Sequence, residues 1–466
     1  MKPLLGLGLM LGMMFALARP QFAQVKLPPY TREVLPNGVV VAVIPHSGVP
    51  LVHFHVLVKG GSESDPPQMA GLASVTAQLL RRGTAKRNAD RFSQDLDYLG
   101  GTFTTGFDAG GSSVEITAEF LAKDFDRGLD LLSDALLHPS FPEDEVAKEI
   151  ARRLDQVRTA KDNPGAAIRS YFQTAFFGRM DPRGNLPDEV TLARIKRKDL
   201  VEDHQKLYCG KNMIVTVAGD FDPAAAKAKL AQTFGAAPAG TAFQWVPAAT
   251  PQRRAQMLLI DKPDATQTYF IIAQPGIDRK NPDREALELV NTVFGGRFLS
   301  MLNEDLRVNT GLTYGANSQV EQMRLPGAIA ISTYTKTETT ERAVDLALEV
   351  LKRLNEKGLS AEQLESAKAY FKGQYPTRQL ETIDQLASVI GEIEMYDLGR
   401  VEVDGLFSRI DAVTLAQVNA AARKYYRTDN LTLVLLGAAD KIRESVKKYD
   451  SHMVEMSVRD PGWGGK

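Results

Sequence analysis

Two stretches of the 466-residue chain resemble each other, and this repeat constrains the fold more than any other feature. One copy is IKRKDLVEDHQKLYCGKNMIVTVAG (195–219), and the other is VTLAQVNAAARKYYRTDNLTLVLLG (413–437). They align without a gap, with Tyr208 matching Tyr426. Each contains a helical pattern, an Asn in a turn and an apolar strand that ends at Gly. Because the copies close units of similar length, the sequence predicts two tandem homologous domains.

The order of the predicted elements indicates the α+β class. β-Branched runs bounded by Gly and Pro predict strands at 38–45 and 49–61. Helical patterns follow at 70–80 and 88–99, and further strands and helices come after them. Since strands and helices do not alternate as in βαβ units, we expect each domain to contain a mostly antiparallel sheet.

Composition suggests where the domains meet. The Ala-, Gly- and Pro-rich stretch at 241–253 lacks periodicity, and we predict that it is a linker. It would separate a first domain at 25–240 from a second domain at 254–466.

The first residues, MKPLLGLGLMLGMMFALARPQFAQ (1–24), resemble a secretory signal. One Lys precedes an apolar run that is shorter than the roughly 20 residues a membrane span needs, and small residues follow it. We therefore expect a cleavable signal peptide, a periplasmic location and no stable membrane anchor.

The charge balance argues against a nucleic-acid partner. Lys and Arg total 56, while Asp and Glu total 57, so no strong net field would attract a polyanion. The single cysteine, Cys209, provides no internal disulfide, and stability must come from packed cores.

The stretch AGLASVTAQLLRRGT (70–84) predicts a helix on which Ser74 and Gln78 share one face near Ala77. Zinc peptidases with an inverted H-x-x-E-H motif place two His ligands and a Glu base on such a face. The stretch resembles the GLAHFLEHMLFKGT helix of the pitrilysin, insulinase and mitochondrial processing peptidase family. In that alignment Ser74 and Gln78 replace the two His residues, and Ala77 replaces the Glu.

These replacements remove the chemistry of the motif. A methyl group cannot accept a proton, and Ser and Gln offer only neutral oxygens where zinc prefers imidazole, thiolate or carboxylate. The resemblance implies a third ligand within KEIARRLDQVRTAKDNP (148–164), and the best alignment places it at Gln156. A shift of one residue would place Asp155 there instead. We expect no metal or other cofactor in this chain.

Further motifs extend the resemblance over nearly the whole mature chain. VLPNGVVVAV (34–43) resembles the family's opening strand, and the segment 191–222 resembles the end of its first domain. FGGRFLSMLNEDLRVNTGLTYGAN (294–317) is similar to the signature of its second domain. The resemblance implies two similar domains, each an antiparallel sheet with helices packed on one face.

Family members that cut peptides also use an Arg and a Tyr, seven residues apart, across a chamber from the zinc. Arg307 and Tyr314 match this pair. By this resemblance they would bind the substrate and its transition state in the active site of a partner, since a guanidinium and a phenol can donate to a carbonyl or an oxyanion. The alternative is an Arg on a solvated helix face and a Tyr at the start of a strand.

We therefore expect a non-catalytic subunit of a heterodimeric zinc metallopeptidase that is inactive alone. A homologous subunit with an intact H-x-x-E-H motif would supply the zinc, and unfolded peptides would be the substrates. The alternative is an inert scaffold or peptide-binding protein of the same fold. An autonomous peptidase would need other ligands, and His53 and His55, on one strand face, have no third partner at a recognisable spacing.

Overall fold

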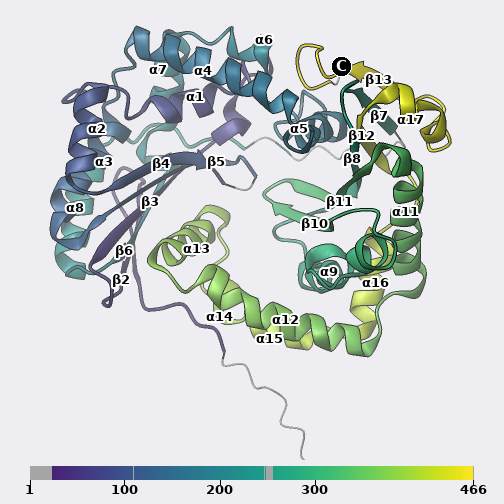
Figure 1. Ribbon diagram of the computed structural model, residues 1–466. Coiled ribbons are helices and arrows are strands. Elements are labelled where there is room, and N and C mark those ends of the chain that lie inside the picture. Colours follow the sequence, from purple (N-terminus) through teal and green to yellow (C-terminus); the bar gives the residue numbers. More distant parts are fainter. Residues whose placement is uncertain (1–23, 109, 246, 248–255, 465–466) are drawn as a thin grey trace, which may run out of the picture.

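The computed structural model describes residues 24–108, 110–245, 247 and 256–464. It contains two halves that lie side by side, each built on a sheet with helices around it (Figure 1). All but the last residue of the predicted signal peptide at 1–24, and most of the predicted linker, lie outside the described residues. In the part of the chain that is described, no helix is both long enough and apolar enough to cross a membrane.

The first sheet has six strands in the order β1-β2-β6-β3-β5-β4. Only the pairing of β2 with β6 is parallel, and the other four pairings are antiparallel. The strands are β1 (Thr31–Val34), β2 (Val40–Pro45), β3 (Leu51–Lys59), β4 (Thr102–Phe107), β5 (Ser113–Leu121) and β6 (Met213–Gly219).

The second sheet has seven strands in the order β13-β7-β12-β8-β11-β10-β9. Here three pairings are antiparallel and three are parallel, so this sheet is more mixed than the sequence predicts. The strands are β7 (Gln256–Asp261), β8 (Gln267–Pro275), β9 (Ile277–Asp278), β10 (Ala316–Met323), β11 (Pro326–Lys336), β12 (Thr432–Gly437) and β13 (Val454–Ser457).

The sequence repeat corresponds to a repeat of topology. In each copy a helix leads into a strand, α7 (Arg197–Leu207) into β6 and α16 (Leu415–Tyr425) into β12. β6 pairs in parallel with β2 and antiparallel with β3, and β12 likewise pairs in parallel with β7 and antiparallel with β8. Every residue of β6 and β12 is buried, which explains why the strand at the end of each copy is mostly apolar.

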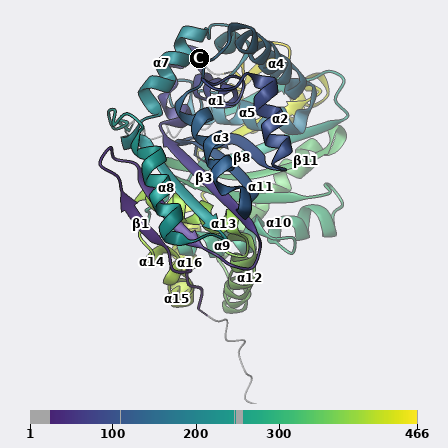
Figure 2. The same ribbon diagram turned by 90° about the vertical axis from the view of Figure 1, so that its left-hand side faces the viewer.

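Helices of the first half cover one face of the first sheet. Alternate residues of β3, including Val52, Phe54 and Val56, pack with residues of α1, α2, α3 and α8. Figure 2 shows α3 and α8 on this outer side. These helices are α1 (Leu72–Leu79), α2 (Ala89–Tyr98), α3 (Phe125–Leu137) and α8 (Pro223–Gly235).

The opposite face of the first sheet is covered by a helix from the second half, α13 (Ile383–Tyr396). The Thr216 hydroxyl of β6 donates to the backbone carbonyl of Ala387 at 2.9 Å. A Cβ added to Gly391 would lie 2.8 Å from Nδ1 of His55, so only glycine allows this approach between helix and strand.

The exchange is reciprocal, because α5 (Pro164–Phe177) of the first half packs on the second sheet. Tyr171 of α5 is fully buried and shares a core with Leu258, Ile271 and Val434. Asn163 caps this helix, and Pro164 occupies its first turn, as is typical of helix starts. The other face of the second sheet packs with helices of its own half, among them α9 (Arg284–Asn291), α11 (Thr340–Lys357) and α16.

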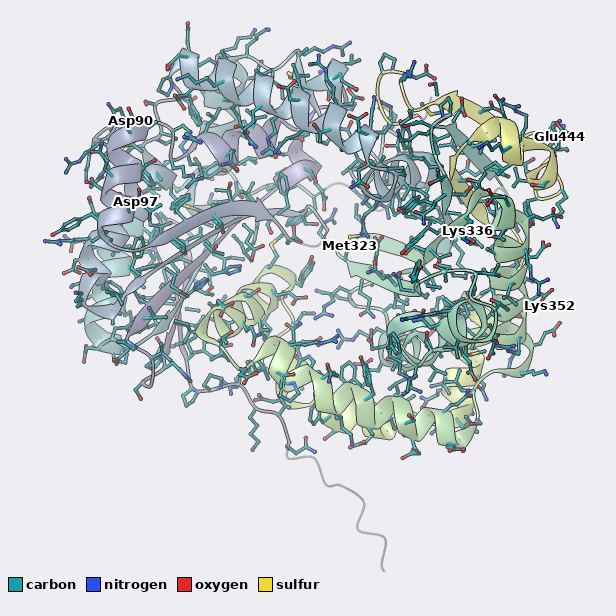
Figure 3. All side chains as sticks on the ribbon, viewed as in Figure 1. Asp90, Asp97, Met323, Lys336, Lys352 and Glu444 are labelled. Carbon is teal, nitrogen blue, oxygen red and sulfur yellow. The ribbon has the colours of Figure 1, made fainter. Side chains whose placement is uncertain are left out.

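The halves also meet directly between the sheets. Figure 3 places Met323, at the end of β10, between the two halves. Arg324 beside it donates both Nε and Nη2 to the buried Glu63 of the first half.

The remaining α-helices are α4 (Glu143–Asp162), α6 (Glu189–Leu192), α10 (Met301–Asn303), α12 (Ala361–Gln379), α14 (Val401–Asp404), α15 (Leu406–Ala412) and α17 (Ala439–Val446).

The α+β class with two related domains is confirmed, and the predicted elements agree closely with the observed ones. The structure adds what the sequence analysis did not foresee, a helix from the other half on the second face of each sheet.

Candidate functional site

Helix α1 is held at its start by a buried carboxyl group. Gly71 precedes the helix with φ of 97°, a left-handed conformation that favours glycine. The two carboxyl oxygens of Asp65 accept hydrogen bonds from the backbone N–H groups of Gly71 at 2.7 Å and Ala73 at 2.8 Å. These bonds satisfy donors that the first turn leaves free.

A second buried acid lies behind the same helix. Burial raises the pKa of Asp203, on α7, to about 6, and a hydrogen bond with Thr76 of α1 opposes this rise. Burial likewise raises the pKa of Asp65 to about 8, against the effect of its backbone hydrogen bonds. The helix that carries the degenerate motif is therefore anchored by polar contacts on its buried side.

The side of α1 that carries the half-buried Ser74 and Gln78 faces a cavity of about 300 Å³. The structure brings Ser74, Ala77 and Gln78 together with Gln156 of α4 around this cavity. The Thr105 hydroxyl of β4 donates to Oε1 of Gln78 at 3.2 Å. The full set of lining residues is Ser74, Ala77, Gln78, Thr105, Gly106, Phe107, Arg152, Arg153 and Gln156.

Two arginines that the sequence analysis missed also line the cavity. Arg152 and Arg153 both donate to the buried carboxylate of Glu149 on the same helix. Nη2 of Arg153 also lies 3.3 Å from the backbone oxygen of Ser74 and donates to it. Their spacing of three and four residues from Gln156 could have signalled a shared helix face.

The register on α4 places Gln156, and not Asp155, at the cavity. Asp155 is exposed and pairs with Arg158 at 3.1 Å, and it is not among the lining residues. Helical periodicity explains the difference, since neighbouring residues point about 100° apart around a helix.

The cavity does not fit zinc. Its lining offers neutral oxygens and two guanidinium groups but no imidazole, thiolate or carboxylate, which are the groups that bind this ion. Across residues 24–464, apart from the undescribed 109, 246 and 248–255, no group of three or more His, Cys, Asp or Glu is arranged to hold a metal.

His53 and His55 project from β3 on the face toward α13. Nδ1 of His53 lies 3.3 Å from the Glu119 carboxylate, and Nε2 of His55 lies 2.6 Å from the Glu115 carboxylate. Burial lowers the pKa of His53. Both rings therefore serve the packing of strand and helix.

Arg307 and Tyr314 lie in the second half, outside the cavity of α1. Arg307 belongs to a π-helical segment, Glu304–Asn309, and its guanidinium stacks 4.6 Å from the centre of the Phe298 ring. The backbone carbonyl of Leu306 accepts hydrogen bonds from the N–H groups of Leu312 and Thr313, which folds the chain back between Arg307 and Tyr314.

Neither member of this pair has a polar partner within the described part of the chain. Among the described residues, Arg307 forms no ion pair and the Tyr314 hydroxyl forms no hydrogen bond, and Tyr314 is 79% exposed. Three more apolar residues of the same region are exposed, namely Phe298, Leu299 and Val308. A cluster of this kind is typical of a surface that meets another molecule.

Fold and site together define a class of protein, a two-domain peptidase-like chain whose metal helix lacks its ligands. Residues 40–183 match the family model described as insulinase, peptidase family M16, and residues 194–371 match the peptidase M16 inactive domain. The chain belongs to the insulinase family, M16.

Curated relatives include proteins of the same length range. The non-peptidase homolog YmxG of Helicobacter pylori is 23% identical over 394 residues, which are 84% of this chain and 90% of that protein. The uncharacterized zinc protease YmxG of Bacillus subtilis is 24% identical over 407 residues, covering 86% and 96% of the two chains.

Solved structures show the same fold. A peptidase M16 inactive domain from Pseudomonas fluorescens superposes with a TM-score of 0.81 at 25% identity, covering 88% of this chain and 98% of that one. A protease from Helicobacter pylori has a TM-score of 0.78 at 18% identity, with coverage of 88% and 100%. The missing ligands, together with the inactive-domain and non-peptidase relatives, identify the chain as an inactive-type M16 member.

Proposed function

We propose that the chain is the non-catalytic subunit of a heterodimeric zinc metallopeptidase. A homologous subunit with an H-x-x-E-H motif supplies the zinc and the base. This chain supplies Arg307, Tyr314 and half of the chamber that encloses an unfolded peptide.

The contrast between the two halves carries the proposal. The first half keeps the motif helix and its fold but places Ser74, Ala77 and Gln78 where the ligands and base would be. The second half keeps Arg307 and Tyr314 without polar side-chain partners among the residues that the structure describes, next to exposed apolar side chains. A guanidinium and a phenol in this state are available to donate hydrogen bonds to a peptide carbonyl or an oxyanion.

The sheet edge supports peptide binding. Strand β4 ends the order of the first sheet, so one side of it has no strand partner among the described residues. An extended peptide can add to such an edge through main-chain hydrogen bonds. The far end of β4, at Thr105–Phe107, leads directly into the cavity beside α1.

Reconstitution tests the proposal. The chain is purified alone and with an H-x-x-E-H homologue from the same genome, and both are assayed with an unfolded peptide. We expect no hydrolysis and no stoichiometric zinc for the chain alone, and hydrolysis by the mixture. Hydrolysis by the homologue alone at the full rate of the mixture, or by this chain alone, would refute the proposal.

The non-peptidase homolog among the relatives favours a second candidate, an inert scaffold or peptide-binding protein. In that case this chain and the H-x-x-E-H homologue would assemble without any gain in hydrolysis. For either function we propose export to the periplasm through the segment 1–24, which a cell fractionation with and without this segment would test.

A further inference from the structure

The charged groups that line the cavity beside α1 are positive, which is the opposite of what a site for a metal ion requires. Its charged lining residues are Arg152 and Arg153, and no carboxylate is among the residues that line it. We infer that this cavity binds the carboxylate of a peptide, with Arg152, Arg153, Gln156 and Ser74 as the donors.

The arginines are held in place but not saturated. Glu149, which is 5% exposed, accepts from Nε and Nη2 of Arg152 and from Nε of Arg153. Nη1 of each guanidinium makes no hydrogen bond within the described residues. One buried carboxylate thus fixes two cations, and the pair retains an excess of positive charge toward the cavity. Fixed, partly free guanidinium groups are suited to a carboxylate.

Neutral donors complete the lining. The Ser74 hydroxyl and the Gln156 amide have no hydrogen-bond partner in the part of the chain that the structure describes. Gln78 accepts from Thr105 through its oxygen, which leaves its NH₂ group as a donor. The replacements that abolish zinc binding therefore also produce a cavity lined mainly by donors.

The position of the cavity indicates a peptide as the source of the carboxylate. The volume of about 300 Å³ is at the lower end of the range of ligand sites and suits one residue of a chain. The unpartnered edge of β4 runs into it at Thr105–Phe107, so a peptide added to that edge would place its end or a side chain there. The shared chemistry is a carboxylate, either the C-terminal group or an acidic side chain.

Fluorescence anisotropy on the full chain tests the inference with three labelled versions of one unstructured peptide. The first has a free C-terminus and no acidic residue, the second has an amidated C-terminus, and the third is amidated with one internal Glu. We expect the first or the third to bind about tenfold more tightly than the second, since a charge-assisted hydrogen bond contributes at least this factor. Tighter binding of the first peptide would identify a C-terminal carboxylate as the bound group, and tighter binding of the third would identify an acidic side chain. Equal binding of all three would overturn the inference.

Variants of α4 test whether the preference for a peptide with a carboxylate arises at this cavity. Arg152→Gln should remove most of the preference, while Arg158→Gln, on the outer side of the same helix, should retain it. Gln156→Glu places a negative charge at the cavity without disturbing Glu149 and should also abolish the preference. A preference that survives both Arg152→Gln and Gln156→Glu would show that the carboxylate binds elsewhere. The measurement uses this chain alone, so its outcome does not depend on whether a partner restores hydrolysis.

Discussion

The two halves of the molecule share the order of five strands, β2-β6-β3-β5-β4 and β7-β12-β8-β11-β10, but differ in how their polar side chains are engaged. In the first half, Arg152 and Arg153 share the buried Glu149 beside a helix that has lost its ligands. In the second half, Arg307 stacks on Phe298 and forms no ion pair with any residue that the structure describes. We propose that the second half uses such side chains to bind a second molecule, whereas the first half has lost the ligands of its motif helix.

The largest effect is expected where the halves exchange helices, because a variant in α13 tests whether the first sheet is stable without the second half. Ile390 of α13 is fully buried in a core that includes Ala42 and Ile44 of the first sheet, although it belongs to the second half of the sequence. Ile390→Ala should reduce the free energy of unfolding by about 2–5 kcal/mol and increase amide exchange in β3 and β6. Val401→Ala, at a residue 66% exposed, serves as the control and should change stability by less than about 0.5 kcal/mol. Protection in β3 that is unchanged by Ile390→Ala would mean that the first sheet is stable without α13.

The proposed role of the second half predicts a large loss of activity without loss of assembly. In the heterodimer, Arg307→Ala or Tyr314→Phe should lower kcat by about a hundredfold, the usual effect of removing one donor to an oxyanion. Tyr98→Phe and Arg158→Ala provide controls at exposed positions in the first half. Size-exclusion chromatography reports assembly, and unchanged kcat in both variants would remove the pair from the proposed mechanism.

The buried Asp203 behind α1 predicts that stability depends on pH through a group in the first half. Because the pKa of Asp203 is raised to about 6, the folded chain binds a proton more tightly than the unfolded chain does. Stability is therefore greatest below about pH 4 with respect to this group and falls by up to about 3 kcal/mol as the pH rises through 6. Denaturant unfolding at several pH values measures the slope, which Asp203→Asn should reduce. An equal slope in the variant would assign the effect to another group, such as Asp65.

The stacking of Phe298 predicts the smallest effect. Phe298→Ala removes the ring beneath Arg307, a contact of about 0.5–1 kcal/mol at an exposed site. In the heterodimer we expect kcat to fall two- to fivefold, about the factor that this energy represents. Leu299→Ala, which removes a neighbouring exposed side chain, is the matched control. A fall as large as that of Arg307→Ala would mean that Phe298 itself contacts the substrate.

Local patterns in the sequence determined much of this protein. The repeat at 195–219 and 413–437 predicted two related domains, and helical periodicity located α1 and α2 within a few residues. The absence of ligands at Ser74 and Gln78 was also a property of the sequence, because the side-chain types alone exclude zinc binding.

Only the tertiary structure decided which distant residues meet. The exchange of α5 and α13 between the sheets, and the position of Arg152 and Arg153 at the cavity, depend on packing between elements far apart in the chain. Periodicity shows that a helix has an apolar face but not which sheet will cover it, since burial of apolar area is not directional. The partner of that face is determined by the complementarity of shapes in the folded chain.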